Sequence, residues 1–90
     1  MAERKAPEEL IEFPCQFQFK AVGLAGDGFR EAILSAVSRH APLSRDAVRC
    51  RPSGNGNYQA VSVLVTLYSY HQLTSIYADM RQAPGLKMLL

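Results

Sequence analysis

The sequence predicts an α+β domain whose elements follow one another in the order β-α-β-β-α-β. Three observations predict it. Apolar and polar side chains alternate in several segments, as in half-buried strands; apolar side chains recur every three or four residues in two others, as in amphipathic helices; and an Asn-Gly pair joins the middle two strands. The chain has 90 residues, which suits one domain, and 48% hydrophobic with 20% charged residues is ordinary globular usage.

The chain begins with a segment that has no apolar periodicity. Residues 1–9 mix charged residues with Ala and Pro, so we expect a flexible tail there and a single ferredoxin-like domain over residues 10–90. The first strand follows at residues 16–22, "QFQFKAV", where Phe17 and Phe19 share the face expected to be buried.

The first helix follows the segment "GLAGDG" over residues 23–28, which we expect to end the first strand. Beyond it, apolar residues recur at intervals of three and four, the stripe of an amphipathic helix. Asp27 is the expected N-cap, because its carboxylate can accept hydrogen bonds from free amides of the first turn. Arg39 and His40 are expected in the last turn, where cations suit the helix dipole, and Pro42 should end the helix.

The second and third strands flank the segment "SGNGN". Val48 and Cys50 have the inward parity of the second strand, and "YQAVSVLVTLY" over residues 58–68 is the clearest strand in the chain. A phosphate-binding glycine loop leads from a strand into a helix, whereas this segment joins two strands. Asn55 and Gly56 form the pair that a tight turn with positive φ requires, so we interpret the segment as a hairpin turn.

The second helix is predicted over "SYHQLTSIYADMRQ", where Ser69 and Gln72 make an S-x-x-Q capping box and Pro84 with Gly85 closes the helix. The last strand, "LKMLL", should place three residues on one face: Leu86, Met88 and Leu90. This order of elements is that of the ferredoxin-like fold, a four-stranded antiparallel sheet with two helices on one face.

The first candidate binding site is the glycine-rich passage from the first strand into the first helix. Its candidate ligand-binding residues are Gly23, Gly26, Asp27 and Gly28. Glycines let a ligand approach the backbone, and the carboxylate of Asp27 would repel a phosphate, so an amine-bearing metabolite fits better than a nucleotide. The alternative is a plain connection with a helix cap, which we favour on balance.

The second candidate site is the sheet face opposite the helices, which no predicted element covers. We expect it to carry Gln18, Lys20, Arg49, Arg51, Tyr58, Ser62, Leu64, Thr66, Tyr68, Lys87 and Leu89. The partner face that we single out consists of Lys20, Arg49, Arg51, Tyr58, Leu64 and Tyr68. Such a mixed surface suits contact with another protein or a second copy in a homodimer, and a solvated face is the alternative. No aromatic side chain of the first strand points outward for base stacking, which disfavours an RNA reader.

Catalytic and metal chemistry find little support in the sequence. His40 and His71 have no third ligand at metal-binding spacing, so we expect no metal site and no cofactor. We expect Cys50 to be buried against the helices and inert, and the carboxylates form no pair suited to acid–base work. We therefore predict that the protein is not an enzyme.

Composition also limits the location and the partners. The start of the chain has no apolar signal segment, and no apolar stretch approaches the roughly 18 residues of a spanning helix, so we expect no membrane association. Two cysteines, Cys15 and Cys50, are too few for a disulfide framework, and we interpret them as reduced thiols of a cytoplasmic protein. The formal charge of +2 does not by itself imply nucleic acid.

Three segments, "IEFPCQFQFKAVG", "VSRHAPL" and "RPSGNGNYQAVSVLV", together resemble the YbeD-like family of small bacterial proteins, and the resemblance runs from about Leu10 to Leu90. It implies a ferredoxin-like domain similar in shape to ACT domains, the amino-acid-sensing regulatory modules of metabolic enzymes. Members of the family are often encoded beside lipoyl-transfer enzymes, which implies a link to lipoate metabolism. The family has no established catalytic residues to carry over, and "GLAGDGF" lacks the proline of the ACT ligand loop.

The sequence therefore predicts a non-catalytic regulatory or adaptor domain that binds a small metabolite or a protein partner. The alternative function is nucleic-acid binding through the basic sheet face, with Lys20, Arg49 and Arg51 as the contacts.

Overall fold

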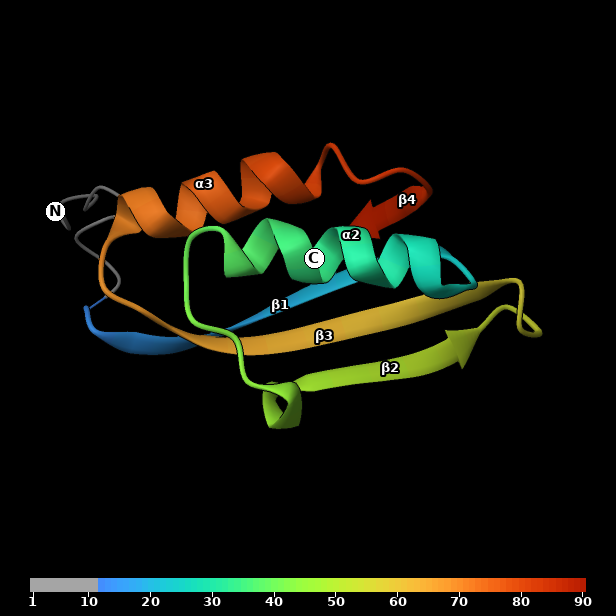
Figure 1. Cartoon of the computed structure of the whole chain (residues 1–90), viewed down its shortest axis with the longest axis horizontal. Helices are drawn as coiled ribbons and strands as arrows, with labels where there is room; N and C mark the ends of the chain where they lie inside the picture. The colour runs from blue at the N-terminus through green and yellow to red at the C-terminus, as the bar shows by residue number, and fades with distance from the viewer. Residues whose placement is uncertain (1–11) are drawn as a thin grey trace, which may run out of the picture.

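The computed structural model describes residues 12–90, so the tail predicted over residues 1–9 lies outside the described residues. Two α-helices lie on one face of a four-stranded antiparallel sheet (Figure 1), and the predicted ferredoxin-like fold class is confirmed. The elements are β1 (Cys15–Leu24), α2 (Asp27–Ser38), the 3-10 helix η1 (Arg45–Ala47), β2 (Val48–Ser53), β3 (Tyr58–Leu67), α3 (Tyr70–Met80) and β4 (Leu86–Leu89).

The sheet has the strand order β2-β3-β1-β4, so β1 and β3 form its centre. These two strands pair along their whole length, from Cys15 opposite Leu67 to Leu24 opposite Tyr58. The alternation seen in the sequence explains this register, because it brings the apolar residues of both strands onto the same face, under the helices. The buried residues of this core are Phe19, Ala21, Phe29, Ile33, Ala36, Val37, Ala41, Val61, Val63, Val65, Leu67, Leu73, Ile76, Met80 and Ala83.

Three aromatic rings connect β1 to α3. The ring centroid of Phe19 lies 4.8 Å from that of Phe17 and 5.0 Å from that of Tyr77, which it meets edge-on. Burial raises the pKa of Tyr77, and the nearby charge of Arg81 partly opposes this effect. Both phenylalanines of β1 thus belong to the helix side of the sheet, as their parity predicted.

The passage from β1 to α2 differs from the prediction in two respects. Gly23 does not end the strand: β1 continues through Leu24, and Gly23 is buried within it. The N-cap of α2 is Gly26, and Asp27 is the first helical residue, whose carboxylate makes no capping hydrogen bond and instead lies 3.5 Å from Nη2 of Arg30. The assignment of Asp27 as the cap was therefore wrong by one position.

The end of α2 is also earlier than predicted. The helix ends at Ser38, with Arg39 as its C-cap, so Arg39 and His40 lie beyond the last helical residue. The amides of His40 and Ala41 still donate to the carbonyl of Val37, at 3.0 Å each. These bonds tighten the end of the helix and satisfy one of its free carbonyls.

The hairpin turn between β2 and β3 is confirmed. Three consecutive residues have positive φ: Gly54 at 57°, Asn55 at 59° and Gly56 at 86°. The amide of Gly56 donates to the carbonyl of Ser53, and that of Asn57 donates to the carbonyl of Gly54, each at 3.1 Å. Asn and Gly are the residues that accept such backbone angles most readily.

The start of α3 is capped as predicted, with one variation. Oγ of the N-cap Ser69 accepts from the amide of Gln72 at 3.1 Å. Oε1 of Gln72 accepts from the amide of Tyr68, one residue before the cap, at 2.8 Å, and its Nε2 donates to the carbonyl of His40 at 2.6 Å. Gln72 therefore ties α3 to the segment that follows α2. The helix ends at Met80.

The face assignment of β4 was wrong. A register shift between Val22 and Gly23 places Met88 opposite Val22 and Leu89 opposite Ala21. Leu89 consequently packs against the core, and Met88 is exposed, the reverse of the prediction. A simple alternation cannot anticipate a bulge, because one extra residue changes the face of every side chain beyond it.

The helix layer does not extend over β2, which lies at the edge of the sheet to the side of both helices (Figure 1). Every residue of β2 is at least partly exposed. Cys50 does point to the helix side, since it pairs with the buried Val61, but it is exposed and not buried as predicted. Strand parity gives the direction of a side chain, whereas its burial depends on whether a helix covers that strand.

Candidate functional site

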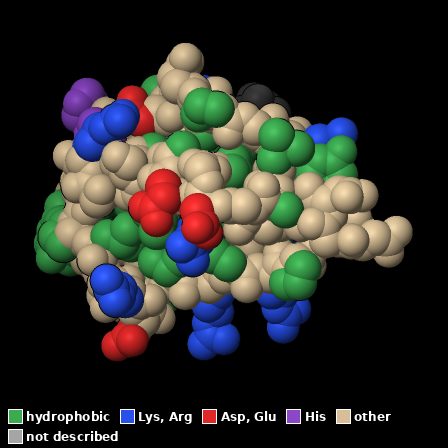
Figure 2. Space-filling view, turned by 45° about the vertical axis from the view of Figure 1, so that its right-hand side comes forward, with side chains coloured by type: hydrophobic (Ala, Val, Ile, Leu, Met, Phe, Trp, Pro, Cys, Tyr) green, Lys and Arg blue, Asp and Glu red, His purple; other side chains and the backbone are tan. Residues whose placement is uncertain are grey.

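The outer face of the sheet is the broadest candidate site. The four strands contain no Asp or Glu, and four basic residues of the strands lie on this face or at its margin: Lys20, Arg49, Arg51 and Lys87. Arg49 pairs with Ser62, which in turn pairs with Lys20, so two of the cations flank one small residue across three strands. Figure 2 shows basic side chains projecting along the lower margin of the molecule, where β2 forms the edge, with an acidic side chain at the left end of this margin.

An apolar strip adjoins these cations. The next row across the sheet consists of Arg51, Ala60, Val22 and Met88. Met88 is 52% exposed and Leu64 is 43% exposed, so large apolar side chains of this face are open to solvent. An exposed apolar patch with a charged rim is the usual composition of a protein-docking surface.

Two tyrosines of the predicted partner face differ in their surroundings. Nζ of Lys87 lies 5.0 Å from the ring centroid of Tyr58 and 3.4 Å from its hydroxyl oxygen, which is the geometry of a cation–π contact. Tyr68 follows the last residue of β3 and is exposed. The structure therefore brings Lys20, Arg49, Arg51, Tyr58 and Leu64 onto one face, and adds Met88, which the sequence reasoning did not include.

The loop predicted as a metabolite site is held by its own chain. The side-chain amide of Gln59 donates to the carbonyls of Leu24 and Gly26, at 2.9 Å and 2.5 Å, and the amide of Ala25 donates to the carbonyl of Asn57 at 3.1 Å. Sequence reasoning missed Gln59. Its signal was a polar residue at the inward parity of β3, which needs a polar partner when it faces a core.

The four candidate residues of this loop do not form one cluster of ligand contacts. Gly23 is buried in β1, where the ring of Phe29 occupies the space that a side chain would need. Gly26, at a φ of 111°, is exposed, as are Asp27 and Gly28 in the first turn of α2. Packing and backbone geometry therefore account for two of the three glycines without a ligand.

A polar cluster that the sequence reasoning also missed connects the ends of the two helices. Nε2 of His40 lies 2.7 Å from Oδ2 of Asp79, and Nη1 of Arg39 lies 3.4 Å from the same oxygen. The hydrogen bond from His40 is the main reason that the pKa of Asp79 is lowered, with Arg39 adding to the effect and desolvation opposing it. Among residues 12–90, no three His, Cys, Asp or Glu side chains come together as metal ligands.

Asp79→Asn should lower the melting temperature in a way that depends on pH. A carboxyl with a lowered pKa in the folded state stabilises the protein above its unfolded pKa of about 3.9, and that contribution is lost as the pH falls through the folded-state pKa. The wild type should therefore melt higher than the variant at neutral pH, and the difference should disappear at strongly acidic pH. Thermal unfolding followed by circular dichroism over this range tests the prediction.

Asp46→Asn is the matched control for this experiment, because no ion pair joins Asp46 to another described residue. We expect it to change the melting temperature little at any pH. A gap between the wild type and Asp79→Asn that stays constant down to the lowest pH would contradict the role given to the carboxylate charge.

None of the helices within residues 12–90 is long and apolar enough to cross a membrane.

Solved structures of similar shape come from several proteins. The protein HP0495 of H. pylori matches with a TM-score of 0.68 and 15% identity over 98% of both chains. The ACT domain of the GTP pyrophosphokinase of Chlorobium tepidum matches with a TM-score of 0.61 and 13% identity, over 83% of this chain and 94% of that domain. At these identities the matches establish a shared fold, that of ACT domains.

Other bacterial proteins share much higher sequence identity with this chain than these solved structures do. A UPF0250 protein of Ectopseudomonas mendocina is 40% identical over 82 residues, 89% of each chain, and one of Azotobacter vinelandii is 39% identical over the same shares. The UPF0250 protein VV0902 of Vibrio vulnificus is 34% identical over 92% of this chain and 89% of its own length. Residues 8–90 match the family described as protein of unknown function DUF493. The resemblance seen in the sequence is thereby confirmed, and the chain belongs to the DUF493 family.

Proposed function

We propose that this protein is a non-catalytic adaptor or regulatory domain that docks on an acidic surface of a protein partner through the outer face of its sheet. The observation that carries the proposal is the charge of that face. Its strands present Lys20, Arg49, Arg51 and Lys87 beside exposed Leu64 and Met88, and they contain no carboxylate. The acidic residue that adjoins this face is Asp46 of η1, which lines a shallow hollow with Arg49 and Leu64. Complementary charge around an apolar centre gives both specificity and rapid association.

The same charge distribution argues against two other occupants. A homodimer that joined two outer faces would bring the cations of one copy against those of the other, which costs free energy. A single-stranded nucleic acid would need aromatic side chains for stacking, but Phe17 and Phe19 of β1 lie on the helix side and the ring of Tyr58 already contacts Lys87. A protein surface rich in Asp and Glu could pair with the cations and at the same time cover the apolar strip.

The fold supports a regulatory role by analogy. The similar domain of Chlorobium tepidum is the ACT domain of a GTP pyrophosphokinase, and is thus a domain of an enzyme. A separate chain with the same fold would act on its partner by association. The resemblance to YbeD-like proteins directs the first search for that partner to cytoplasmic enzymes of lipoate metabolism.

A small metabolite bound at the loop of Gly23, Gly26, Asp27 and Gly28 is the second candidate function. The observation that favours it is a hollow of about 360 Å³ beside the start of α2, lined by Leu24, Ala25, Gly28, Phe29, Ala32, Pro84 and Gly85. A thermal-shift screen of amino acids and lipoate-pathway metabolites tests it, since a ligand at a hundred times its Kd should stabilise the fold by about 2.7 kcal/mol.

Photo-crosslinking in cells tests the docking face directly. A photoreactive amino acid placed at Leu64, on the outer face, should give a discrete adduct with one partner, whereas the same group at Thr74, exposed on α3, should not. Mass spectrometry should locate the adduct on a segment of the partner rich in Asp and Glu. Arg49→Glu with Arg51→Glu should reduce the yield by about tenfold or more, because close charge pairs across interfaces are strongly coupled.

Arg81→Glu is the control for the charge reversal, since Arg81 is exposed at the end of α3, on the helix side. It should leave the yield unchanged. An adduct that contains two copies of this chain would replace the proposal with self-association, and an adduct removed by nuclease would replace it with nucleic-acid binding. Equal labelling from Leu64 and Thr74 would contradict a docking face altogether.

A further inference from the structure

A groove runs between α2 and the uncovered inner side of β2. It exists because the helix layer stops short of this edge strand, so that β2 and α2 form two separate walls (Figure 1). The hollow has a volume of about 650 Å³, which lies within the range of small-molecule sites in proteins. Arg30, Glu31, Leu34, Arg45, Val48 and Cys50 line it.

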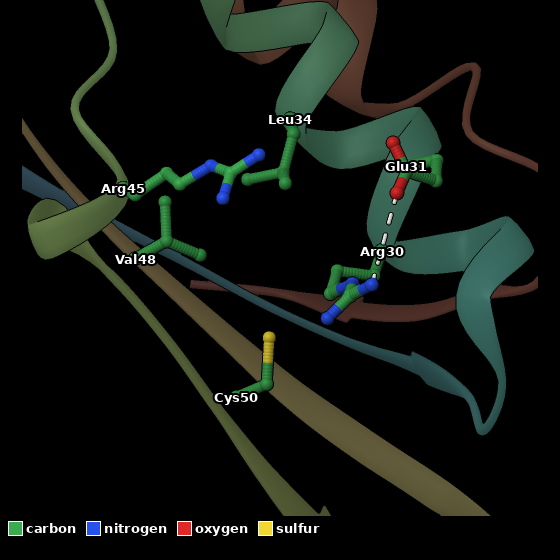
Figure 3. A pocket seen from close by; sticks show the side chains of 6 residues that line it. All are labelled: Arg30, Glu31, Leu34, Arg45, Val48 and Cys50. Carbon is green, nitrogen blue, oxygen red and sulfur yellow. Dashed lines mark ion pairs between the residues drawn. The ribbon is translucent and has the colours of Figure 1, made fainter.

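The side chains in the groove separate into a basic part and an apolar part. Figure 3 shows the guanidinium groups of Arg30 and Arg45 pointing into the hollow from opposite sides, α2 and η1. Leu34 lies beside the guanidinium group of Arg45, Val48 lies below Arg45 in this view, and the thiol of Cys50 points in from β2. The apolar part continues along β2, because a neighbouring hollow of about 250 Å³ shares Cys50 and extends to Pro52.

The two arginines keep hydrogen-bonding capacity for an anion. Asp27 and Glu31 both contact Nη2 of Arg30, at 3.5 Å and 3.7 Å, so neither uses Nη1. Nε of Arg30 is buried and has no hydrogen-bond partner among the described residues. Within the same part of the chain, no ion pair involves Arg45. A buried donor without a partner costs free energy and calls for an explanation such as an absent ion.

We propose that this groove binds a small carboxylate that carries a short apolar chain, with the carboxylate between Arg30 and Arg45 and the chain along Leu34, Val48 and Cys50. Guanidinium groups pair with carboxylates through charge-assisted hydrogen bonds. The apolar wall distinguishes such an acid from an inorganic anion, which would leave Leu34 and Val48 without a contact. The single acidic side chain of the lining, Glu31, is already engaged by Arg30.

This site is separate from the proposed docking face. Arg49 and Arg51 point to the outer side of β2, whereas Val48 and Cys50 point to the groove, since neighbouring residues of a strand face opposite sides. Failure of the crosslinking experiment would therefore leave the groove proposal intact, and the reverse also holds.

Cys50 provides a direct readout of occupancy. The chain has two cysteines, so a Cys15→Ser protein retains Cys50 as its single thiol. The rate at which neutral iodoacetamide alkylates Cys50 should fall as hexanoate is added, and the effect should saturate. At a hundred times the Kd only about one protein in a hundred is free, so the rate should fall well over tenfold. Hexanol and hexylamine, with the same chain and without a carboxylate, should protect far less.

Single substitutions test the role of each arginine in binding the carboxylate. Arg45→Gln and Arg30→Gln should each raise the hexanoate concentration needed for half-protection by about tenfold, the loss of one charge-assisted hydrogen bond. Arg81→Gln, at the C-cap of α3, should leave this concentration unchanged. Because Arg45 is exposed in the 3-10 helix η1, its variant remains informative if Arg30→Gln fails to fold. Equal protection by hexanol or by inorganic phosphate, or protection that does not saturate, would overturn the proposal.

Discussion

Gly23→Ala should lower the melting temperature by roughly 4–24 °C. A Cβ atom at this position would lie 2.5 Å from Cζ and 2.6 Å from Cδ1 of Phe29, closer than real Cβ contacts. The ring of Phe29 is buried, so moving it away from the new methyl group would disturb its packing in the core. Inserting a group into a packed core costs about 1–3 kcal/mol, and each kcal/mol corresponds to about 4–8 °C in a domain of this size. Thermal unfolding followed by circular dichroism measures the shift.

Gly28→Ala is the matched control, because it lies in the same glycine-rich segment. No atom lies within 4 Å of a Cβ built at Gly28, and this residue lies in the first turn of α2. Alanine favours a helix over glycine by up to about 1 kcal/mol, so this variant should melt at the same temperature or higher. A second control combines Gly23→Ala with Phe29→Ala, where the added methyl group should cost far less than in the wild type.

These outcomes also test whether the glycine-rich segment between β1 and α2 is explained by packing or by a ligand. If Gly23→Ala lowers the melting temperature as expected and Phe29→Ala relieves the cost, the glycine is required by the packing of β1 against α2. If Gly23→Ala melts like the wild type, the glycine needs another explanation, and the metabolite site at Gly23, Gly26, Asp27 and Gly28 becomes the stronger candidate.

The fold could be predicted from the sequence because its signals are local and agree with one another. Alternation predicts the strands β1 and β3, apolar stripes predict the helices α2 and α3, and the Asn55-Gly56 pair predicts the turn. The fixed handedness of crossover connections and the short loops then leave few ways to arrange these elements. The capping residue Ser69 was predictable for the same reason: its partner Gln72 is three residues away.

The features that could not be predicted depend on how distant elements meet. The exposure of Cys50 follows from a helix layer that stops short of β2, and the faces of Met88 and Leu89 follow from a bulge opposite Gly23. The pair of His40 and Asp79 joins residues 39 positions apart, which no sequence spacing reveals. The groove likewise needs the packing of α2, η1 and β2 together.

Gly56→Val should lower the free energy of unfolding by about 1–3 kcal/mol, through the backbone alone. Gly56 has a φ of 86°, a conformation that a β-branched residue almost never adopts, and holding a residue there costs about that much. No atom lies within 4 Å of a Cβ built at this position, so no steric overlap contributes, in contrast to Gly23. The amide of Gly56 closes the turn through the carbonyl of Ser53, so relaxing φ would also weaken the connection between β2 and β3.

Asn57→Val separates this backbone effect from the effect of a β-branched side chain in the turn. Asn57 is exposed in the same turn, its φ is not positive, and its structural bonds use the backbone. We expect Asn57→Val to melt within a few degrees of the wild type and Gly56→Asn, which tolerates positive φ, to melt between the wild type and Gly56→Val. Thermal unfolding of the three variants and the wild type measures the melting temperatures, and urea unfolding measures the differences in free energy. Equal stabilities of Gly56→Val and Asn57→Val would show that the positive φ of Gly56 contributes nothing to the stability of this hairpin.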